Sequence, residues 1–232
     1  MSSYTDNEFG EIVIHKRKGA KSVRIRVGTD GRYLVSAPLY TPLFYIKQVV
    51  NSSREQLRKL AINSSVENPY TEGQVIGQSH TLAVVQTQMV AKPQVKTERK
   101  RLIVYLPPDH ELSETAIQQQ IRDEVVKILR REAKAYLPGR LNQIAQAHGF
   151  RYERVRFSHA GGRWGSCSST GTISLNIALM KLTPVLIDYV LIHELSHTRQ
   201  MNHSPAFWRE VEQLDPLYKL HRQQIKRETP TV

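Results

Sequence analysis

Short stretches in the first half of the chain alternate apolar and polar residues or are apolar throughout, which is typical of β-strands. We expect strands at residues 11–15, 22–28, 32–37, 75–76, 81–86 and 102–106. Thr29-Asp30-Gly31 is a hairpin signal. One helix is predicted with Thr41 as its N-cap, Pro42 as its first residue and apolar positions as far as Leu60, followed by a polar link over 64–71. These elements predict a small antiparallel β-rich region.

The second half of the chain follows the period of the α-helix. An amphipathic helix is predicted to begin at Ser113, to break or kink at Leu137-Pro138-Gly139 and to end at His148-Gly149. The remaining predicted elements are strands 154–158 and 172–176 around a Gly/Ser-rich loop, and helices that begin at Thr183-Pro184, Ser204-Pro205 and Asp215-Pro216. No internal repeat is visible in the sequence, and the order of elements predicts an α+β fold.

Composition narrows the class of protein. Hydrophobic residues make up 40% of the 232 residues and charged residues 23%, which excludes wholesale disorder. The longest apolar stretches, on either side of Asp188, are far too short to span a bilayer, and residues 1–10 lack the features of a secretory signal. The single cysteine, Cys167, excludes an internal disulfide and fits a reducing compartment. We therefore expect a cytoplasmic protein without a membrane partner.

The charge balance is strongly basic. Lys and Arg number 33 against 21 Asp and Glu, a formal net charge of +12, which favours binding to polyanions. The densest basic stretch runs from His15 to Lys21 and is followed by Arg24 and Arg26, which lie on one face of a predicted strand. Aromatic residues do not interleave with these charges, so a platform for base stacking is not predicted. Nonspecific nucleic-acid or nucleotide binding stays open, and the sequence does not indicate an oligomeric state.

Residues 191–197 contain the pattern H-E-x-x-H. Residues four apart lie one turn apart on the same face of a helix, so His193 and His197 can offer two imidazole nitrogens to one zinc ion. Glu194 lies about 100° around the helix from His193, where it can reach a water molecule on that ion. The apolar residues that share the histidine face are Leu186, Tyr189 and Val190. The imidazoles are therefore expected where the helix meets the protein interior.

A third histidine, His203, follows His197 by six residues, just past the predicted helix end at Met201-Asn202. A chain that turns there brings His203 to the same ion, which gives three protein ligands and an open position. Glu210 and Glu212 are alternative third ligands.

Two other interpretations of the histidines stay open. Cys167 is a candidate fourth ligand of a structural zinc site, although that leaves Glu194 without a role. Histidines on a buried helix face can also be hydrogen-bonded core residues. A nucleophilic role for Cys167 is not supported, because no base is paired with it in the sequence.

Glycine and small residues around a short strand at 163–167 suit an edge strand with an open backbone. An extended peptide can add to such an edge and place its scissile bond over a metal ion. The alternative is an ordinary polar hairpin in which Trp164 belongs to the core. Phe207 and Trp208 are interpreted as packing residues that anchor the His203 turn.

Together these segments resemble the YgjP-like zinc metallopeptidase family, which is related to the WLM and SprT-like minimal gluzincins. The matching segments are Arg163-Trp164-Gly165-Ser166-Cys167, Ile173 to Asn176, Asp188 to His197, Asn202-His203-Ser204 and Phe207-Trp208. The match is specific over about residues 150–220 and looser in the N-terminal part. The histidine spacing equals that of metzincins, but Gln200 stands where those proteins have glycine, which favours a turn after Met201.

The resemblance implies a basic β-rich region over 1–110 and a mainly helical, zincin-like catalytic domain with a short edge-strand sheet over 111–232. It implies one zinc ion per chain on His193, His197 and His203, with Glu194 as catalytic base. The substrate-binding residues expected from the cleft-facing strand and its neighbour are Arg163, Trp164, Ser166 and Asn176.

The sequence therefore predicts a zinc-dependent hydrolase, in the first place a metallopeptidase acting on polypeptides. Two alternatives use the same features. A metal-dependent hydrolase of nucleotide phosphoanhydrides fits the positive charge but lacks a P-loop and a carboxylate cluster for magnesium. A nucleic-acid-associated basic protein with a structural zinc leaves Glu194 unexplained.

Overall fold

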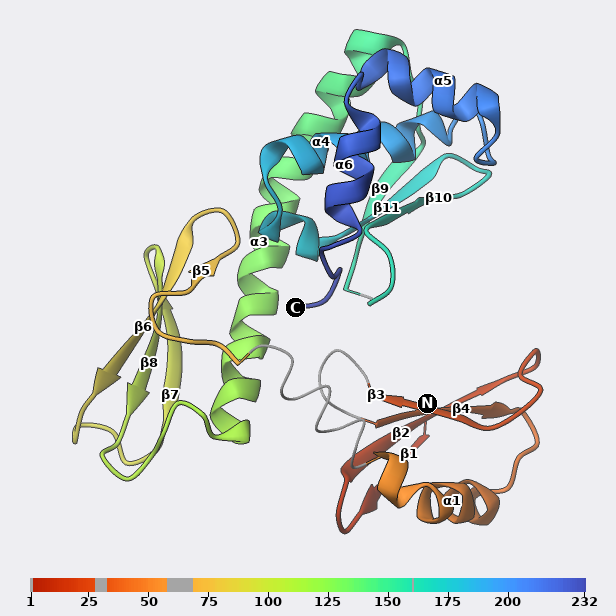
Figure 1. Cartoon of the computed structure of the whole chain (residues 1–232). Helices are drawn as coiled ribbons and strands as arrows, with labels where there is room; N and C mark the ends of the chain where they lie inside the picture. The colour runs from red at the N-terminus through yellow and green to blue at the C-terminus, as the bar shows by residue number, and fades with distance from the viewer. Residues whose placement is uncertain (1, 28–32, 58–68, 160) are drawn as a thin grey trace. The chain divides into compact units, whose positions relative to one another are not determined.

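The computed structural model describes residues 2–27, 33–57, 69–159 and 161–232 (Figure 1). The chain forms two compact units, residues 1–71 with 110–120 and residues 72–109 with 121–232. Strands and helices follow one another along the chain, so the predicted α+β class is confirmed. The second unit includes residues 72–109, which the predicted division at residue 110 assigns to the N-terminal region. That division stays a prediction about where the catalytic region begins.

Unit 1 contains a four-stranded sheet in the order β1-β2-β4-β3. Its elements are β1 (Ser2–Asp6), β2 (Gly10–Arg17), β3 (Arg24–Val27), β4 (Tyr33–Pro38) and the helix α1 (Leu43–Ser52). β1 with β2 and β3 with β4 are antiparallel, as expected, whereas β2 and β4 are parallel, which the sequence did not predict. β3 lies on the far side of β4, so the connection from β2 to β3 passes the position of β4. The predicted hairpin turn at 29–31 and the predicted helix end at Leu60 lie outside the described residues.

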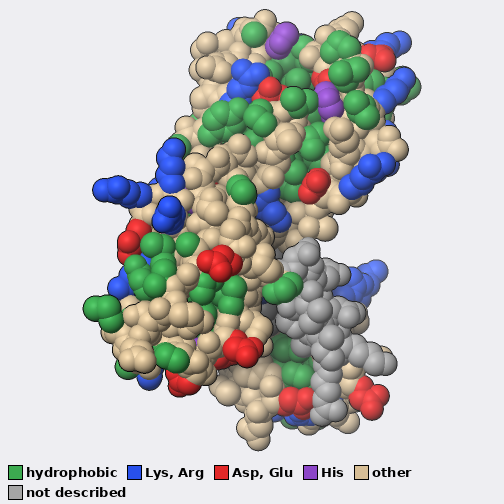
Figure 2. Space-filling model, turned by 60° about the vertical axis from the view of Figure 1, so that its left-hand side comes forward, with side chains coloured by type: hydrophobic (Ala, Val, Ile, Leu, Met, Phe, Trp, Pro, Cys, Tyr) green, Lys and Arg blue, Asp and Glu red, His purple; other side chains and the backbone are tan. Residues whose placement is uncertain are grey.

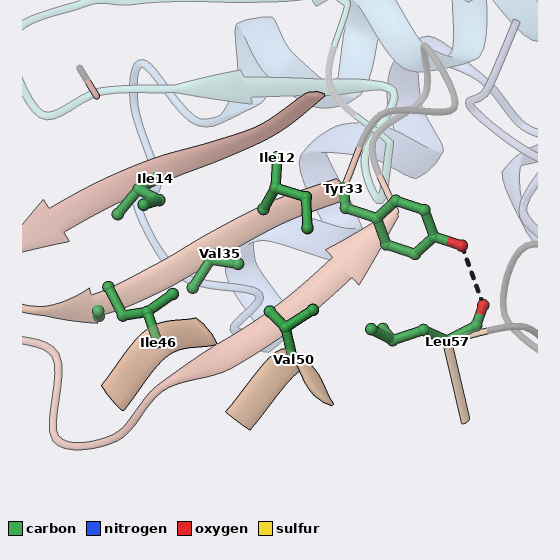
Figure 3. Packing of buried hydrophobic residues seen from close by; sticks show 8 residues of the cluster. Ile12, Ile14, Tyr33, Val35, Ile46, Val50 and Leu57 are labelled. Carbon is green, nitrogen blue, oxygen red and sulfur yellow. Dashed lines mark hydrogen bonds between the residues drawn. The ribbon is translucent and has the colours of Figure 1, made fainter. Parts of the chain in front are cut away.

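The core of unit 1 lies between α1 and one face of this sheet (Figure 3). Ile46 and Val50 of α1 pack against a layer of alternate strand residues that includes Ile12, Ile14 and Val35. Successive side chains of a strand point to opposite faces of the sheet. On β3, Arg24 and Arg26 are therefore exposed, while the residue between them packs toward the core. α1 begins one residue later than predicted, since Pro42 takes the cap position instead of Thr41.

A second sheet, in unit 2, repeats the topology of the first. Its strands are β5 (Val75–Ile76), β6 (His80–Gln86), β7 (Gln94–Glu98) and β8 (Arg101–Leu106), in the order β5-β6-β8-β7. The outer pairs are antiparallel and the central pair is parallel, as in unit 1. Each set of four strands is followed by a helix. The fold therefore contains a repeat that is not visible in the sequence, and the sequence pattern missed β1 and β7.

Glu132 holds the second sheet to the long helix α3 (Thr115–His148). Its carboxylate accepts hydrogen bonds from Ser79 Oγ (2.7 Å) and from the backbone N–H of Gln78 (2.9 Å), and it pairs with His80 Nδ1 at 3.0 Å. The Gln78 side chain in turn donates to the carbonyl oxygens of Met180 and Leu182, each at 2.8 Å. One turn before β6 thus connects three segments of unit 2.

The helix α3 continues through Pro138, so of the predicted break or kink the break was wrong, and the kink stays a prediction. A proline in a helix removes one backbone hydrogen bond and costs about 3 kcal/mol. Here the buried stripe continues on both sides of it through Ala133, Leu137 and Leu141, all fully buried. Packing of that stripe offsets the local cost. Among the described residues, no helix combines the length and the apolar character that crossing a membrane requires.

The remaining elements of unit 2 surround the helix α4 (Pro184–Ser196). They are β9 (Arg154–Ser158), β10 (Gly165–Cys167), β11 (Thr172–Asn176), the 3₁₀ helix η1 (Ile177–Lys181), α5 (Pro205–Leu214) and α6 (Tyr218–Ile225). The three strands form a sheet in the order β10-β11-β9, in which β10 is an edge strand as predicted. α4 contacts α5, α6 and β10 (Figure 1).

Substituting Glu132→Ala removes the acceptor that three groups of the β5–β6 turn share. We expect the free energy of unfolding to fall by about 1–3 kcal/mol, because the buried His80 loses its partner while Gln78 and Ser79 are exposed to water. Denaturant unfolding measures it. Glu124→Ala on the same helix is the control, because its pair with Lys127 is exposed and contributes about 0–1 kcal/mol. Equal losses in both variants contradict the assigned role of Glu132.

Candidate metal centre

The helix α4 is buried on almost every side and delivers the H-E-x-x-H residues to the interior of unit 2. It begins at Pro184 after Thr183, as the sequence predicts, and ends at Ser196 rather than near Met201-Asn202. Hydroxyl groups in the last turn explain the early end, because Ser196 Oγ donates to Ile192 O at 2.9 Å and Thr198 Oγ1 donates to a carbonyl three residues back.

His197 is the C-cap of α4, yet the one-turn spacing of the two histidines is kept. Its backbone N–H still donates to His193 O at 3.3 Å, and its backbone conformation is helical. The chain turns at once after it, through residues 197–199, and then reaches His203. The turn therefore comes before Met201, not after it as the comparison with metzincins suggested.

Three imidazoles meet at this turn. Ligand nitrogens of His193, His197 and His203 all lie within 4.8 Å of one another. The Nε2 atoms of His193 and His203 are 3.0 Å apart. Among the described residues, the converging donors do not include Cys167, Glu210 or Glu212. Glu210 instead accepts from Arg199 at 2.7 Å, and neither a cysteine-containing four-ligand site nor a glutamate third ligand has support here.

Aromatic side chains of α5 hold the three rings. Phe207, fully buried, stacks on His197 with 4.6 Å between ring centroids and a 28° interplanar angle. Trp208 stacks on His203 at 5.5 Å and 22°, and Tyr218 stacks on Trp208 at 5.5 Å. The predicted packing role of Phe207 and Trp208 thus includes direct support of the imidazoles.

His193 is in the form that binds a metal ion. Burial, together with the neighbouring His197, His203 and Arg222, lowers the pKa of His193 to about 3. Burial and neighbouring charges also lower the pKa of His203. The His193 ring is therefore neutral at pH 7 and keeps one nitrogen with a free lone pair.

Gln200 fixes the orientation of His197. His197 Nδ1 lies 3.1 Å from Gln200 O, and because a carbonyl only accepts, the ring donates from Nδ1 and leaves Nε2 free for a metal. Sequence reasoning did not identify this partner, since a backbone carbonyl has no residue-specific signal.

The donor set fits a zinc ion. Zinc is bound by imidazole nitrogens at about 2.0–2.1 Å, so two ligand nitrogens of a tetrahedral site lie roughly 3.3 Å apart. The 3.0 Å separation of the His193 and His203 nitrogens is close to this value. Two imidazole nitrogens can approach so closely when one donates a hydrogen bond to the other or when both bind one cation.

Glu194 is buried beside the histidines, with 5% of its side chain exposed. Its Oε2 atom has no hydrogen-bond partner among the described residues. Burial raises the pKa of Glu194 to about 8, and the charge of Arg163 opposes that shift. A carboxyl with a raised pKa is suited to accept and return a proton near neutrality.

Gly165 of β10 makes room for Glu194. A Cβ atom at position 165 would lie 2.6 Å from Glu194 Oε1 and 2.8 Å from Cδ. The glycine therefore permits the edge strand to lie directly against the carboxylate. The sequence marked the segment 163–167 but gave no reason for a glycine at this position.

The other predicted substrate residues fall into two groups. Arg163 is exposed, and Trp164 and Ser166 are half-buried on or beside the edge strand. Asn176 is fully buried, and its amide N–H groups donate to Arg163 O (3.1 Å) and Pro230 O (3.0 Å). Its Oδ1 accepts from the backbone N–H of Ala178. Asn176 therefore positions the backbone before β10 through its hydrogen bond to Arg163 O. Its contact with substrate stays a prediction.

The model of the YgjP-like metallopeptidase domain matches residues 21–228. The chain belongs to this family. The YgjP-like match includes the α4 histidines, Glu194 and the edge strand, and it confirms the resemblance drawn from the sequence. Membership assigns the chain to the metallopeptidases at family level.

One solved structure similar to this YgjP-like chain is described as the crystal structure of the metallopeptidase zymogen of Pyrococcus abyssi abylysin. The two chains are 31% identical over 38% of this chain and 90% of the other, with a TM-score of 0.36. No curated protein matches the chain.

Gly165→Ala tests the contact between β10 and Glu194. We expect a lower free energy of unfolding, by about 1–3 kcal/mol, because an added methyl group overpacks the site. Thermal or denaturant unfolding measures the change. Gly139→Ala is the matched control, because no atom lies within 4 Å of its added Cβ and alanine favours the helix by roughly 0.5–1 kcal/mol. A Gly165→Ala protein as stable as the wild type shows that the strand does not need glycine there.

Proposed function

We propose that this chain is a zinc-dependent peptidase in which His193, His197 and His203 hold the ion and Glu194 is the general base. The observation that supports this most is the convergence of three imidazoles beside a buried carboxyl group without a partner on Oε2. Neither a structural zinc site nor a hydrogen-bonded histidine cluster needs such a carboxyl group.

Zinc, when bound, supplies a Lewis acid that polarises a carbonyl group and lowers the pKa of water. Glu194 accepts a proton from the attacking water at Oε2 and later delivers it to the nitrogen of the leaving amine. Nearby positive charge lowers a carboxyl pKa, so Glu194 is ionised at neutral pH when the site is loaded. The apolar surroundings of α4 keep bulk water away from this proton.

The edge strand β10 is the proposed binding site for the substrate backbone. Its residues pair with β11 on one side, Gly165 with Leu175 and Cys167 with Ile173, while the sheet has no strand on its other side among the described residues. An extended peptide added there forms main-chain hydrogen bonds and runs past Glu194. Arg163, Trp164 and Ser166 are then the side chains nearest to it.

Glu194→Gln keeps the shape of the side chain but removes the base. We expect the variant to retain its zinc and to lose turnover by at least about 100-fold, the size of a general-base contribution. Digestion of denatured casein, with and without a chelator, measures turnover. Nucleoside triphosphates are assayed in parallel as the alternative substrate class. A Glu194→Gln protein as active as the wild type contradicts the proposal.

Removal of a ligand changes metal content directly. The wild type is expected to hold about one zinc per chain, and His193→Ala or His197→Ala to lose it, because two imidazoles alone bind zinc weakly. Elemental analysis of the purified proteins measures the content. His148→Ala, at the exposed end of α3, is the control and should keep the ion. Equal zinc in all four proteins excludes the proposed centre.

A cytoplasmic location and nonspecific nucleic-acid binding stay predictions from the sequence. They are independent of the peptidase proposal.

A further inference from the structure

Two arginines bring positive charge to the candidate centre from different elements. Arg222 lies on α6, with its Cζ atom 4.4 Å from the centroid of the Trp208 ring. Trp208 is the ring that stacks on His203. Arg163 lies two residues before Gly165, which touches Glu194. Both side chains are exposed at the protein surface.

The two charges lie beside different groups of the site. Arg163 precedes the edge strand whose Gly165 lies against Glu194, and Arg222 lies over the Trp208 ring that stacks on His203. One cation therefore belongs to the side of the carboxyl group and the other to the side of the histidines.

Neither arginine is neutralised by a carboxylate within ion-pair distance in the described part of the chain. The acidic residues of α5 and the segment after it are engaged elsewhere: Glu210 with Arg199 at 2.7 Å, Glu212 with Lys219 at 3.9 Å and Asp215 with His221 at 2.7 Å. Exposed guanidinium groups beside an active centre are available to bind anions, and a carboxylate suits their fork of donors.

We propose that Arg163 and Arg222 form two anion subsites that select polypeptide segments with Asp or Glu on both sides of the scissile bond. The inference rests on the proposed peptidase function. An extended chain can place separate carboxylates at the two arginines, which lie on α6 and just before β10. Lys and Arg side chains spread over the visible face of the molecule add long-range attraction for acidic substrates (Figure 2).

Binding is measured first, without catalysis, on the Glu194→Gln protein. Fluorescent peptides of one sequence carry Glu, Gln or Lys at the positions flanking the centre, and anisotropy gives each affinity. The Glu peptide is expected to bind about tenfold more tightly than the Gln peptide at low salt, and less so at high salt. Arg222→Glu or Arg163→Glu in this background should remove the preference and favour the Lys peptide.

The charge variants have matched controls. Gln224→Glu adds a negative charge on the same helix, about 200° around its axis from Arg222, and should leave the preference unchanged. Arg222→Lys keeps the charge and should keep the preference. Arg163→Glu separates loss of the charge from loosening of Trp208, because among the described residues Arg222, and not Arg163, lies over an aromatic ring. Zinc content and melting temperature are checked in each protein.

Cleavage is measured second, by mass spectrometry of a denatured protein digest. Wild-type cuts enriched in flanking Asp and Glu, with enrichment lost in Arg222→Glu, support the proposal. Cuts without acidic enrichment, or with a pattern that Arg222→Glu and Arg163→Glu leave unchanged, overturn it. No cut by the wild type, with the binding preference intact, contradicts the peptidase function instead. Hydrolysis of nucleoside triphosphates that depends on Arg222, without peptide cleavage, overturns the substrate class.

Discussion

A carboxylate placed inside a protein without full hydrogen bonding is unfavourable by several kcal/mol, and the arrangement of unit 2 depends on accommodating one. Glu194 sits in the last turns of α4, whose other faces are packed by hydrophobic neighbours. The edge strand can touch it because position 165 has no side chain. The core around α4 therefore supplies the stability that allows one carboxyl group to stay buried without a partner on Oε2.

The three imidazoles depend on a second layer of contacts. Phe207 stacks on the ring of His197, and Trp208 stacks on the ring of His203. The carbonyl of Gln200 accepts a hydrogen bond from Nδ1 of His197 and so fixes the ring proton on that nitrogen. Asn176 plays the corresponding part for the strand, since its amide joins the backbone before β10 to the C-terminal segment. Backbone atoms thus carry much of the positioning at this centre.

Much of this arrangement follows from local sequence patterns. The helical period and the Thr-Pro and Ser-Pro starts predicted α4 and α5, and the i,i+4 spacing predicted that His193 and His197 lie together. What the sequence could not show depends on tertiary packing. The helix through Pro138 survives because its buried stripe is continuous, and α4 ends early because hydroxyl groups compete for its carbonyls. The parallel strand pairs and the repeated topology of the two sheets leave no periodic signal in the residues.

The early end of α4 also orients an electric field. Thirteen residues of helix align their peptide dipoles, and the negative pole of that macrodipole lies at His197. A cation near this pole gains about 0.3–1 kcal/mol, and an anion there is disfavoured by a similar amount. The C-terminal end of α4 therefore stabilises a positive ion beside His197, and this contribution of the backbone adds to that of the three imidazole nitrogens.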